Sequence, residues 1–318
     1  MQPYTCTVRS GGVSVDFFSS KDLYQTFSRS RYSLFIPEFS CARASPRDGP
    51  RVVYTESKSR DLRCTPRVVS ISFPWEEMRD GETILYLAYP LIERQHQERR
   101  YLTAHAAAFS FGNTAFLIFG KEGAGKTSTL ISMCQQFGAK LVANDLCIIG
   151  WKDKTNPVVY GGTKFFFIRR ESARRTLPQL LPYFKEDGDD SWLEKAIICP
   201  KDLGVELEAR ELPVNVSFLV HVDETKQELF GRAIDDLPTR LYFNENFSRY
   251  IRTASTTMLG GDKYDLLGYV PSLDTKRFYE WRRELIKYLL VKQGVRYVSG
   301  PLPLVAEEIA KLCHKAQS

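Results

Sequence analysis

The sequence predicts an α/β fold from about residue 99 to residue 318, preceded by a small β-rich unit over residues 1–98. Short, wholly apolar runs alternate with helically spaced apolar residues in the second part, whereas the first part has only short strand-like segments. The length of 318 residues fits one large domain or two smaller ones. The contents of 43% apolar and 26% charged residues are those of a globular chain and exclude a disordered one.

The N-terminal unit is predicted from two segments in which apolar and polar residues alternate. Residues 13–17 and 68–73 have this alternation, which is typical of half-buried strands. The polar stretch at 43–67 is rich in Arg, Ser and Pro and predicts a loop. We find no catalytic motif in this unit.

A helix is predicted over residues 81–103, where apolar side chains recur at helical spacing. Pro90 is expected to kink or interrupt this helix, because proline removes a hydrogen bond from the helix interior. The charged run at 93–100 is interpreted as the solvated face of the helix.

The middle of the chain carries the strongest local pattern. Residues 115–119 form a short apolar run, which is typical of a strand buried on both faces. Residues 120–127 follow at once, then a predicted helix that Gly138 ends, and then a second strand at 140–145 with a polar end. The remaining predicted elements are strands at 163–168 and 214–222, a partly helical segment at 172–184, a solvent loop at 187–190, and helices at 276–292 and 304–315.

Charge and cysteine usage exclude several classes of protein. The net charge of +6 is spread along the chain, whereas a nucleic-acid-binding protein would carry a clustered basic stripe. No apolar run is long enough for a membrane span, and no secretory signal pattern is present at the N-terminus. The seven cysteines are widely spaced and include no C-x-x-C pair, which favours free thiols and a cytoplasmic location.

Residues 120–127 match the pattern G-x-x-x-x-G-K-[ST] without exception. Glycines in such a loop allow backbone N–H groups to face an anion, and the following helix adds its positive end to the same site. The Lys126 ammonium is expected to reach the β- and γ-phosphates of a nucleotide, and the Thr127 hydroxyl to bind Mg²⁺. The predicted nucleotide-binding residues are Gly120, Glu122, Gly123, Ala124, Gly125, Lys126, Thr127 and Ser128.

Further motifs narrow the class of nucleotide-binding protein. The Asn-Lys-x-Asp motif of GTPases is absent, and residues 258–262 are only a poor match to the Leu-Ser-Gly-Gly-Gln motif of ABC ATPases. No helicase-type motif follows the loop. Asp145 ends the predicted second strand, where a carboxylate is well placed to face a metal ion and the γ-phosphate.

Three segments between residues 101 and 150 resemble the catalytic domain of the HPr kinase/phosphorylase family. They are His-Ala-Ala-Ala at 105–108, the 120–127 loop, and Leu-Val-Ala-Asn-Asp at 141–145. The resemblance implies a P-loop kinase core with a mixed sheet, of the kind shared with phosphoenolpyruvate carboxykinase. It also implies ATP and Mg²⁺ as cofactors and assembly into a homo-oligomer. The family's glycine-rich signature for docking the HPr protein is absent, so HPr is not the expected acceptor.

The resemblance also implies roles for single residues. Asp145 is expected to serve Mg²⁺ together with Thr127 and to act as the base on an acceptor hydroxyl, assisted by His105 and with Lys126 neutralising phosphate charge. The family has two adjacent aspartates where this chain has Asn144 and Asp145. Apart from the resemblance, phosphoryl transfer needs further cations to offset the charge of the transferred group. Candidates for a second phosphate clamp are Lys164, Arg169, Arg170, Arg249 and Arg252, and candidates for outer metal ligands are Glu206 and Glu208.

The sequence therefore predicts an ATP- and Mg²⁺-dependent kinase that transfers the γ-phosphoryl group to a hydroxyl of a small molecule. Two alternatives stay open. The first is a serine/threonine kinase acting on a peptide or protein. The second is a nucleotide-binding regulatory protein with little catalysis, which the neutral Asn144 leaves open. Neither a nucleic-acid partner nor a membrane partner is expected.

Overall fold

The computed structural model describes residues 4–43, 48–153, 156–185, 194–252, 259–260, 265–266 and 270–317, so the predicted loop at 187–190 lies outside it. Its contacts divide the chain into two compact units. The first comprises Met1–Thr103 and Glu245–Arg282, and the second comprises Ala104–Asn244 and Arg283–Ser318. The division expected after residue 98 is close to the first of these boundaries. The return of Glu245–Arg282 to the first unit was not predicted, because it depends on tertiary packing.

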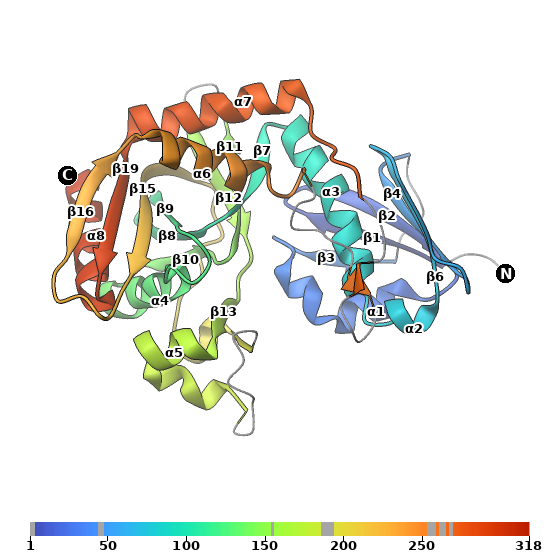
Figure 1. Ribbon diagram of the computed structural model, residues 1–318, viewed down its shortest axis with the longest axis horizontal. Coiled ribbons are helices and arrows are strands. Elements are labelled where there is room, and N and C mark those ends of the chain that lie inside the picture. Colours follow the sequence, from blue (N-terminus) through green and yellow to red (C-terminus); the bar gives the residue numbers. More distant parts are fainter. Residues whose placement is uncertain are drawn as a thin grey trace. The chain divides into compact units, whose positions relative to one another are not determined.

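The sheet of the first unit has the strand order β3-β1-β2-β4-β6-β5 (Figure 1). Strands β2, β4 and β6 run parallel, and antiparallel partners flank them on both sides. The bounds are β1 (Tyr4–Ser10), β2 (Val13–Ser19), β3 (Ser40–Ala42), β4 (Arg51–Glu56), β5 (Asp61–Cys64) and β6 (Val68–Phe73). The strands predicted at 13–17 and 68–73 are confirmed. The loop predicted at 43–67 is wrong where β4 and β5 lie, because the buried Val52 and Tyr54 of β4 are too few to stand out among polar neighbours.

The first unit also contains α1 (Leu23–Arg29), the 3-10 helix η1 (Arg31–Phe35), α2 (Trp75–Met78) and α3 (Glu82–Glu98). Helix α3 continues through Pro90, so the predicted interruption is wrong. Leu87 and Leu91 are fully buried on either side of it, and packing of this face offsets the cost of about 3 kcal/mol for an interior proline.

The interpretation of residues 93–100 as a solvated helix face is right for residues 98–100, which are exposed, and wrong for Glu93, His96 and Gln97, which are buried. The Glu93 side chain is completely buried, and its carboxylate accepts hydrogen bonds from the Thr103 N–H at 3.0 Å and the Gln97 side-chain amide at 2.7 Å. His96 is buried beside it and contacts the Ser10 carbonyl oxygen at 3.0 Å. Paired polar groups of this kind are tolerated in an interior, so charge alone did not indicate exposure.

The larger sheet is mixed, with the order β10-β8-β9-β15-β12-β11-β7 and with β19 also beside β15 and β16 beside β19. Strands β9, β15 and β19 run parallel at its centre. The bounds are β7 (Tyr101–His105), β8 (Ala107–Phe111), β9 (Thr114–Phe119), β10 (Lys140–Ala143), β11 (Leu146–Trp151), β12 (Pro157–Gly162), β15 (Leu212–Val222), β16 (Phe230–Ile234) and β19 (Val295–Gly300). The strands predicted at 115–119, 140–145 and 214–222 are therefore confirmed in outline.

Strand β9 is buried on both faces, as predicted. Phe116 and Ile118 belong to a core that includes Leu130 of helix α4 (Lys126–Phe137) and Ile309 of helix α8 (Leu302–Gln317). On the other side, the Phe119 ring packs edge-on against Phe243 of helix α6 (Leu237–Ser248), with 4.7 Å between ring centroids. The strand therefore lies between helices, and its carboxyl end is held from both faces.

Further elements complete the described chain. Strands β13 (Phe166–Arg169) and β14 (Lys195–Ile198) form a separate antiparallel pair. The others are helix α5 (Arg170–Thr176), the 3-10 helices η2 (Pro178–Tyr183) and η3 (Pro200–Leu203), strands β17 (Leu259–Gly260) and β18 (Asp265–Leu266), helix α7 (Lys276–Lys287) and the π-helical η4 (Tyr288–Gly294). In the described ranges, no helix combines the length and the apolar character that crossing a bilayer requires.

Candidate functional site

The 120–127 loop joins the end of β9 to the start of α4, which confirms the predicted strand–loop–helix order. Gly125 has a φ of 89°, and a Cβ atom there would lie 2.5 Å from Cγ2 of Val222. A Cβ atom on Gly120 would lie 2.9 Å from the carbonyl oxygen of Val220. Both positions require glycine because the loop lies directly against β15.

The loop backbone is held by bonds to its neighbours. The Val222 N–H donates to the Ala124 carbonyl at 2.9 Å. The Tyr242 hydroxyl accepts from the Gly120 N–H at 3.0 Å and donates to the Gly120 carbonyl at 3.0 Å. Sequence reasoning missed Tyr242, and no local signal marks it. The N–H groups of the first turn of α4 have no acceptor within the helix, which is the arrangement that binds anions.

Lys126 is the first residue of α4 and is only 8% exposed. Its Nζ donates to the carbonyl oxygens of Gly120 at 2.9 Å and Lys121 at 3.2 Å. The ammonium is thus held against the loop by two neutral acceptors. A phosphate oxygen forms a stronger, charge-assisted bond with an ammonium than a carbonyl does.

The Ser128 side chain is not available to a ligand. It is 1% exposed and its hydroxyl lies 2.8 Å from that of Thr176. The side chain therefore joins α4 to α5 inside the protein, and only its backbone N–H is left for a ligand. Ala124 is likewise buried and contributes backbone alone.

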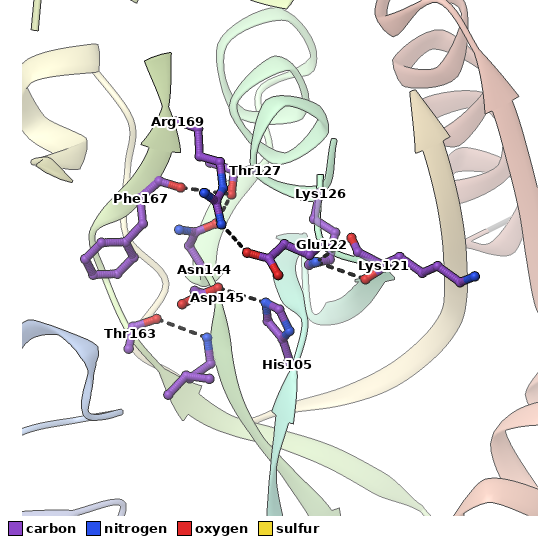
Figure 2. A network of polar contacts seen from close by, with 12 residues as sticks. His105, Lys121, Glu122, Lys126, Thr127, Asn144, Asp145, Thr163, Phe167 and Arg169 are labelled. Carbon is purple, nitrogen blue, oxygen red and sulfur yellow. Dashed lines mark hydrogen bonds and ion pairs between the residues drawn. The ribbon is translucent and has the colours of Figure 1, made fainter. Parts of the chain in front are cut away.

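The hydroxyl of Thr127 points at the end of the next strand (Figure 2). It donates to Oδ1 of Asn144 at 3.1 Å, and the amide nitrogen of Asn144 donates to the Phe165 carbonyl at 3.0 Å. Asn144 is completely buried, and its own N–H donates to the Thr163 carbonyl at 2.8 Å. The asparagine side chain is therefore held in one orientation, with its oxygen toward Thr127.

His105 and Asp145 form a pair beside the loop (Figure 2). Nε2 of His105 lies 3.0 Å from Oδ1 of Asp145. Each residue is at the centre of a three-residue turn, because the Ala106 N–H donates to the Ala104 carbonyl and the Leu146 N–H donates to the Asn144 carbonyl. Asp145 has a φ of 70°, which is rare for a residue other than glycine and is found disproportionately at functional sites.

Electrostatics keep the Asp145 carboxylate ionised. Burial by itself raises the pKa of this carboxyl. The hydrogen bond and charge of His105, together with the charges of Lys195 and Lys126, outweigh burial, so the pKa of Asp145 lies well below its ordinary value. Lys195 was not among the predicted site residues. Lys195 is the residue opposite Arg169 in the β13–β14 ladder, and this strand pairing brings it close to Asp145.

The predicted charged residues around the loop differ in the partners that they bind. Glu122 in the loop forms an ion pair with Arg169. Lys164 instead donates to the Val142 and Glu208 carbonyls, and Arg170 forms an ion pair with Glu194, so these two candidate clamps have structural partners. Arg249 and Arg252 belong to the first unit of the chain.

The candidate outer metal ligands also have other partners. Glu206 is exposed and forms an ion pair with Lys140 at 2.8 Å. Glu208 bonds to Arg210 at 2.6 Å, which together with backbone N–H bonds lowers its pKa to about 2 although burial opposes the shift. We therefore withdraw both residues as metal ligands. Among the described residues, no cluster of three His, Cys, Asp or Glu side chains could hold a metal ion.

The residues that remain nevertheless suit Mg²⁺ bound together with a nucleotide. The Thr127 hydroxyl and Asn144 carbonyl oxygen are 3.1 Å apart, and Asp145 adds a carboxylate from the next residue. Mg²⁺ prefers oxygen ligands and usually takes only one or two from the protein, with phosphate oxygens and water completing its shell.

Comparisons with known proteins add little information on the family or function of this chain. No model of a protein family matches the chain, and no curated protein matches it in sequence. A solved structure of the HPr(Ser) kinase/phosphatase from Coxiella burnetii is similar at 11% identity and a TM-score of 0.32, covering 68% of this chain and 95% of that one. The structural similarity to that kinase is therefore weak, and membership of its family stays a prediction.

Proposed function

We propose that this protein is an ATP- and Mg²⁺-dependent phosphotransferase that acts on a hydroxyl group. One observation carries the proposal. The 120–127 loop with Lys126 and Thr127 lies beside the His105–Asp145 pair (Figure 2), so groups that would bind phosphate are close to an ionised carboxylate. Phosphoryl transfer depends chiefly on positioning and on neutralising charge, and these groups supply both.

The roles follow from the contacts. Lys126 and the first-turn N–H groups of α4 would bind the β- and γ-phosphates, since both offer donors to anions. Thr127, Asn144 and Asp145 would hold Mg²⁺, which when bound offsets the phosphate charge. Because all three present oxygen atoms, they are chemically suited to this ion.

Asp145 would also orient the acceptor hydroxyl. One of its oxygens bonds to His105, so we assign the other to the acceptor proton. A carboxyl with a lowered pKa is a weak base, and it is adequate where the nucleophile mainly needs orientation and loses its proton late. His105 would hold the carboxylate in place as a positioning residue.

A second candidate function, a nucleotide-binding regulatory protein, rests on Asn144. The side-chain amide is neutral, completely buried and bonded at both ends, where a second carboxylate would bind the metal more strongly. Weak metal binding would leave nucleotide binding intact and slow the transfer step.

The test compares wild-type protein with the Lys126→Ala and Asp145→Asn variants in ATP and Mg²⁺. The acceptors are pooled hydroxylated metabolites and short Ser- or Thr-containing peptides, with phosphate adducts detected by mass. Lys311→Ala serves as the matched control, because Lys311 is an exposed lysine of α8 paired with Glu307. An adduct on a metabolite, lost in both site variants and kept in the control, supports the proposal.

The other outcomes discriminate among the alternatives. Adducts on peptides alone would favour a peptide or protein kinase. Nucleotide binding without any adduct would favour the regulatory protein. Failure of the wild-type protein to bind ATP would overturn the proposed function altogether.

A further inference from the structure

The 120–127 loop contains a carboxylate of its own. Glu122 forms an ion pair with Arg169, the last residue of β13 (Figure 2). The Arg169 side chain is 11% exposed, whereas that of Glu122 is 64% exposed. The arginine is therefore well enclosed at the edge of the site, and its acidic partner extends into solvent.

Two lysines lie close to the part of the site that contains Arg169. Lys195 is directly opposite it in the β13–β14 ladder, and the charges of Lys195 and Lys126 both act on Asp145. The Thr127 hydroxyl lies 3.5 Å from the carbonyl oxygen of Phe167, two residues before Arg169. Strand β13 therefore runs beside the first turn of α4, where a bound phosphate would lie.

A carboxylate and a phosphate present similar oxygen pairs to a guanidinium. Arginine bonds to either group bidentately, and the bond is charge-assisted in both cases. A terminal phosphate carries more negative charge than a single carboxylate. It would therefore compete with Glu122 for the same guanidinium.

We propose that Glu122 occupies Arg169 in the nucleotide-free protein and that the terminal phosphate of a nucleoside triphosphate displaces it. This inference rests on the proposed function and assigns to Arg169 the recognition of the γ-phosphate. Glu122 then acts as an internal competitor. It lowers the affinity for every ligand that uses Arg169 and is expelled into solvent when the triphosphate binds.

The experiment measures calorimetric dissociation constants of ATP, ADP and inorganic triphosphate for the full-length protein. The variants are Glu122→Gln, Arg169→Gln and the double variant. We expect Glu122→Gln to tighten ATP and triphosphate binding about 3- to 10-fold, because the competing charge is gone. Arg169→Gln should weaken ATP binding at least about tenfold and ADP binding less than about threefold, which is the loss of one charge-assisted contact to the third phosphate.

The double variant provides the decisive comparison. Once Arg169 is removed, Glu122 has no guanidinium to hold, so the double variant should match Arg169→Gln within about twofold. The control is the nearby exposed pair of Glu171 and Arg174 on α5, whose Gln variants should leave all three constants unchanged. If Arg169→Gln fails to fold, Arg169→Lys keeps the charge without the bidentate geometry and should weaken ATP binding to a smaller extent.

Three results would overturn the inference, and only the last of them would also overturn the proposed function. If wild-type protein binds ATP but Glu122→Gln binds it no more tightly, or Arg169→Gln weakens ATP and ADP equally, the exchange is refuted and the proposed function stands. If wild-type protein binds none of the three ligands, both fail together.

Discussion

The Thr127 hydroxyl donates a 3.1 Å hydrogen bond to the side-chain oxygen of Asn144, and this bond joins the end of the 120–127 loop to the strand end that carries Asp145. Asn144 could not do this with its side chain reversed, because its amide nitrogen is bonded to the Phe165 carbonyl. The asparagine therefore both orients Thr127 and presents a neutral oxygen where an acidic residue would present a charged one.

Replacing Asn144 by aspartate should have opposite effects without and with metal. In EDTA, we expect Asn144→Asp to lower the free energy of unfolding by about 1–3 kcal/mol, because a buried carboxylate would face the Phe165 carbonyl without a donor. With Mg²⁺ and ATP, the added charge should raise metal affinity and recover the loss. Under the proposed function, turnover at limiting Mg²⁺ should also rise.

Thermal unfolding with and without Mg²⁺·ATP checks this prediction. Asn215→Asp is the matched control, since Asn215 makes the same type of bond to a backbone carbonyl, that of Ala316. Asn215→Asp should lower the thermal stability, and Mg²⁺·ATP should not restore it. A variant at 144 that Mg²⁺·ATP stabilises no more than the wild-type protein would contradict a metal site here.

Asp145 should make stability depend on pH in the acid range. Its folded-state pKa is lowered, so the wild-type advantage over Asp145→Asn is fully present above the unfolded pKa of about 3.9 and is lost as the pH falls below it. At pH 7 we expect an advantage of about 1.5–3 kcal/mol, the usual range for a hydrogen bond to a charged group.

Urea unfolding of both proteins at pH 7, 5, 4 and 3 measures this difference. The exposed Asp202, replaced by Asn, is the control and should show no such dependence. A difference between wild type and Asp145→Asn that stays constant down to pH 3 would mean that the carboxylate does not contribute through its charge.

Lys126→Ala should weaken ATP binding without unfolding the protein. The lysine donates to the Gly120 and Lys121 carbonyls, which are neutral acceptors, so we expect the free energy of unfolding to change by less than about 1 kcal/mol. ATP affinity should fall at least about tenfold through loss of the charge-assisted contacts to phosphate. Calorimetry and urea unfolding on the same samples, with Lys311→Ala for comparison, distinguish this from a protein that simply unfolds.

Gly125 and Gly138 allow backbone strain to be compared with steric overlap. Both have positive φ, but a Cβ on Gly125 would meet Val222 at 2.5 Å, whereas a Cβ on Gly138 would have nothing within 4 Å. We expect Gly138→Ala to cost about 1 kcal/mol from strain alone and Gly125→Ala about 2–4 kcal/mol. Denaturant unfolding measures both, and adding Val222→Ala to Gly125→Ala should recover part of the larger loss. Equal costs at the two glycines would show that the loop does not lie against β15 as described.

Local sequence patterns correctly predicted the elements that are defined by residues adjacent in the chain. The apolar run at 115–119, the glycine pattern at 120–127 and the helix ended by Gly138 all occur where they were predicted. Pro90 and Glu93 show the limit of such patterns. Proline is unfavourable inside a helix, and a glutamate side chain is unfavourable in an interior. Both are nevertheless found there in α3, because residues from elsewhere in the chain pack around this helix.

By itself, the sequence determined the loop, its strand and helix, and the candidate residues Lys126, Thr127 and Asp145. Only the tertiary structure decided that His105 bonds to Asp145, that Asn144 orients Thr127, and that Glu122 pairs with Arg169. The same holds for Tyr242, which anchors the loop from α6. The physical reason is that hydrogen bonds and ion pairs act over a few ångströms in space, and chain folding alone determines which distant residues come that close.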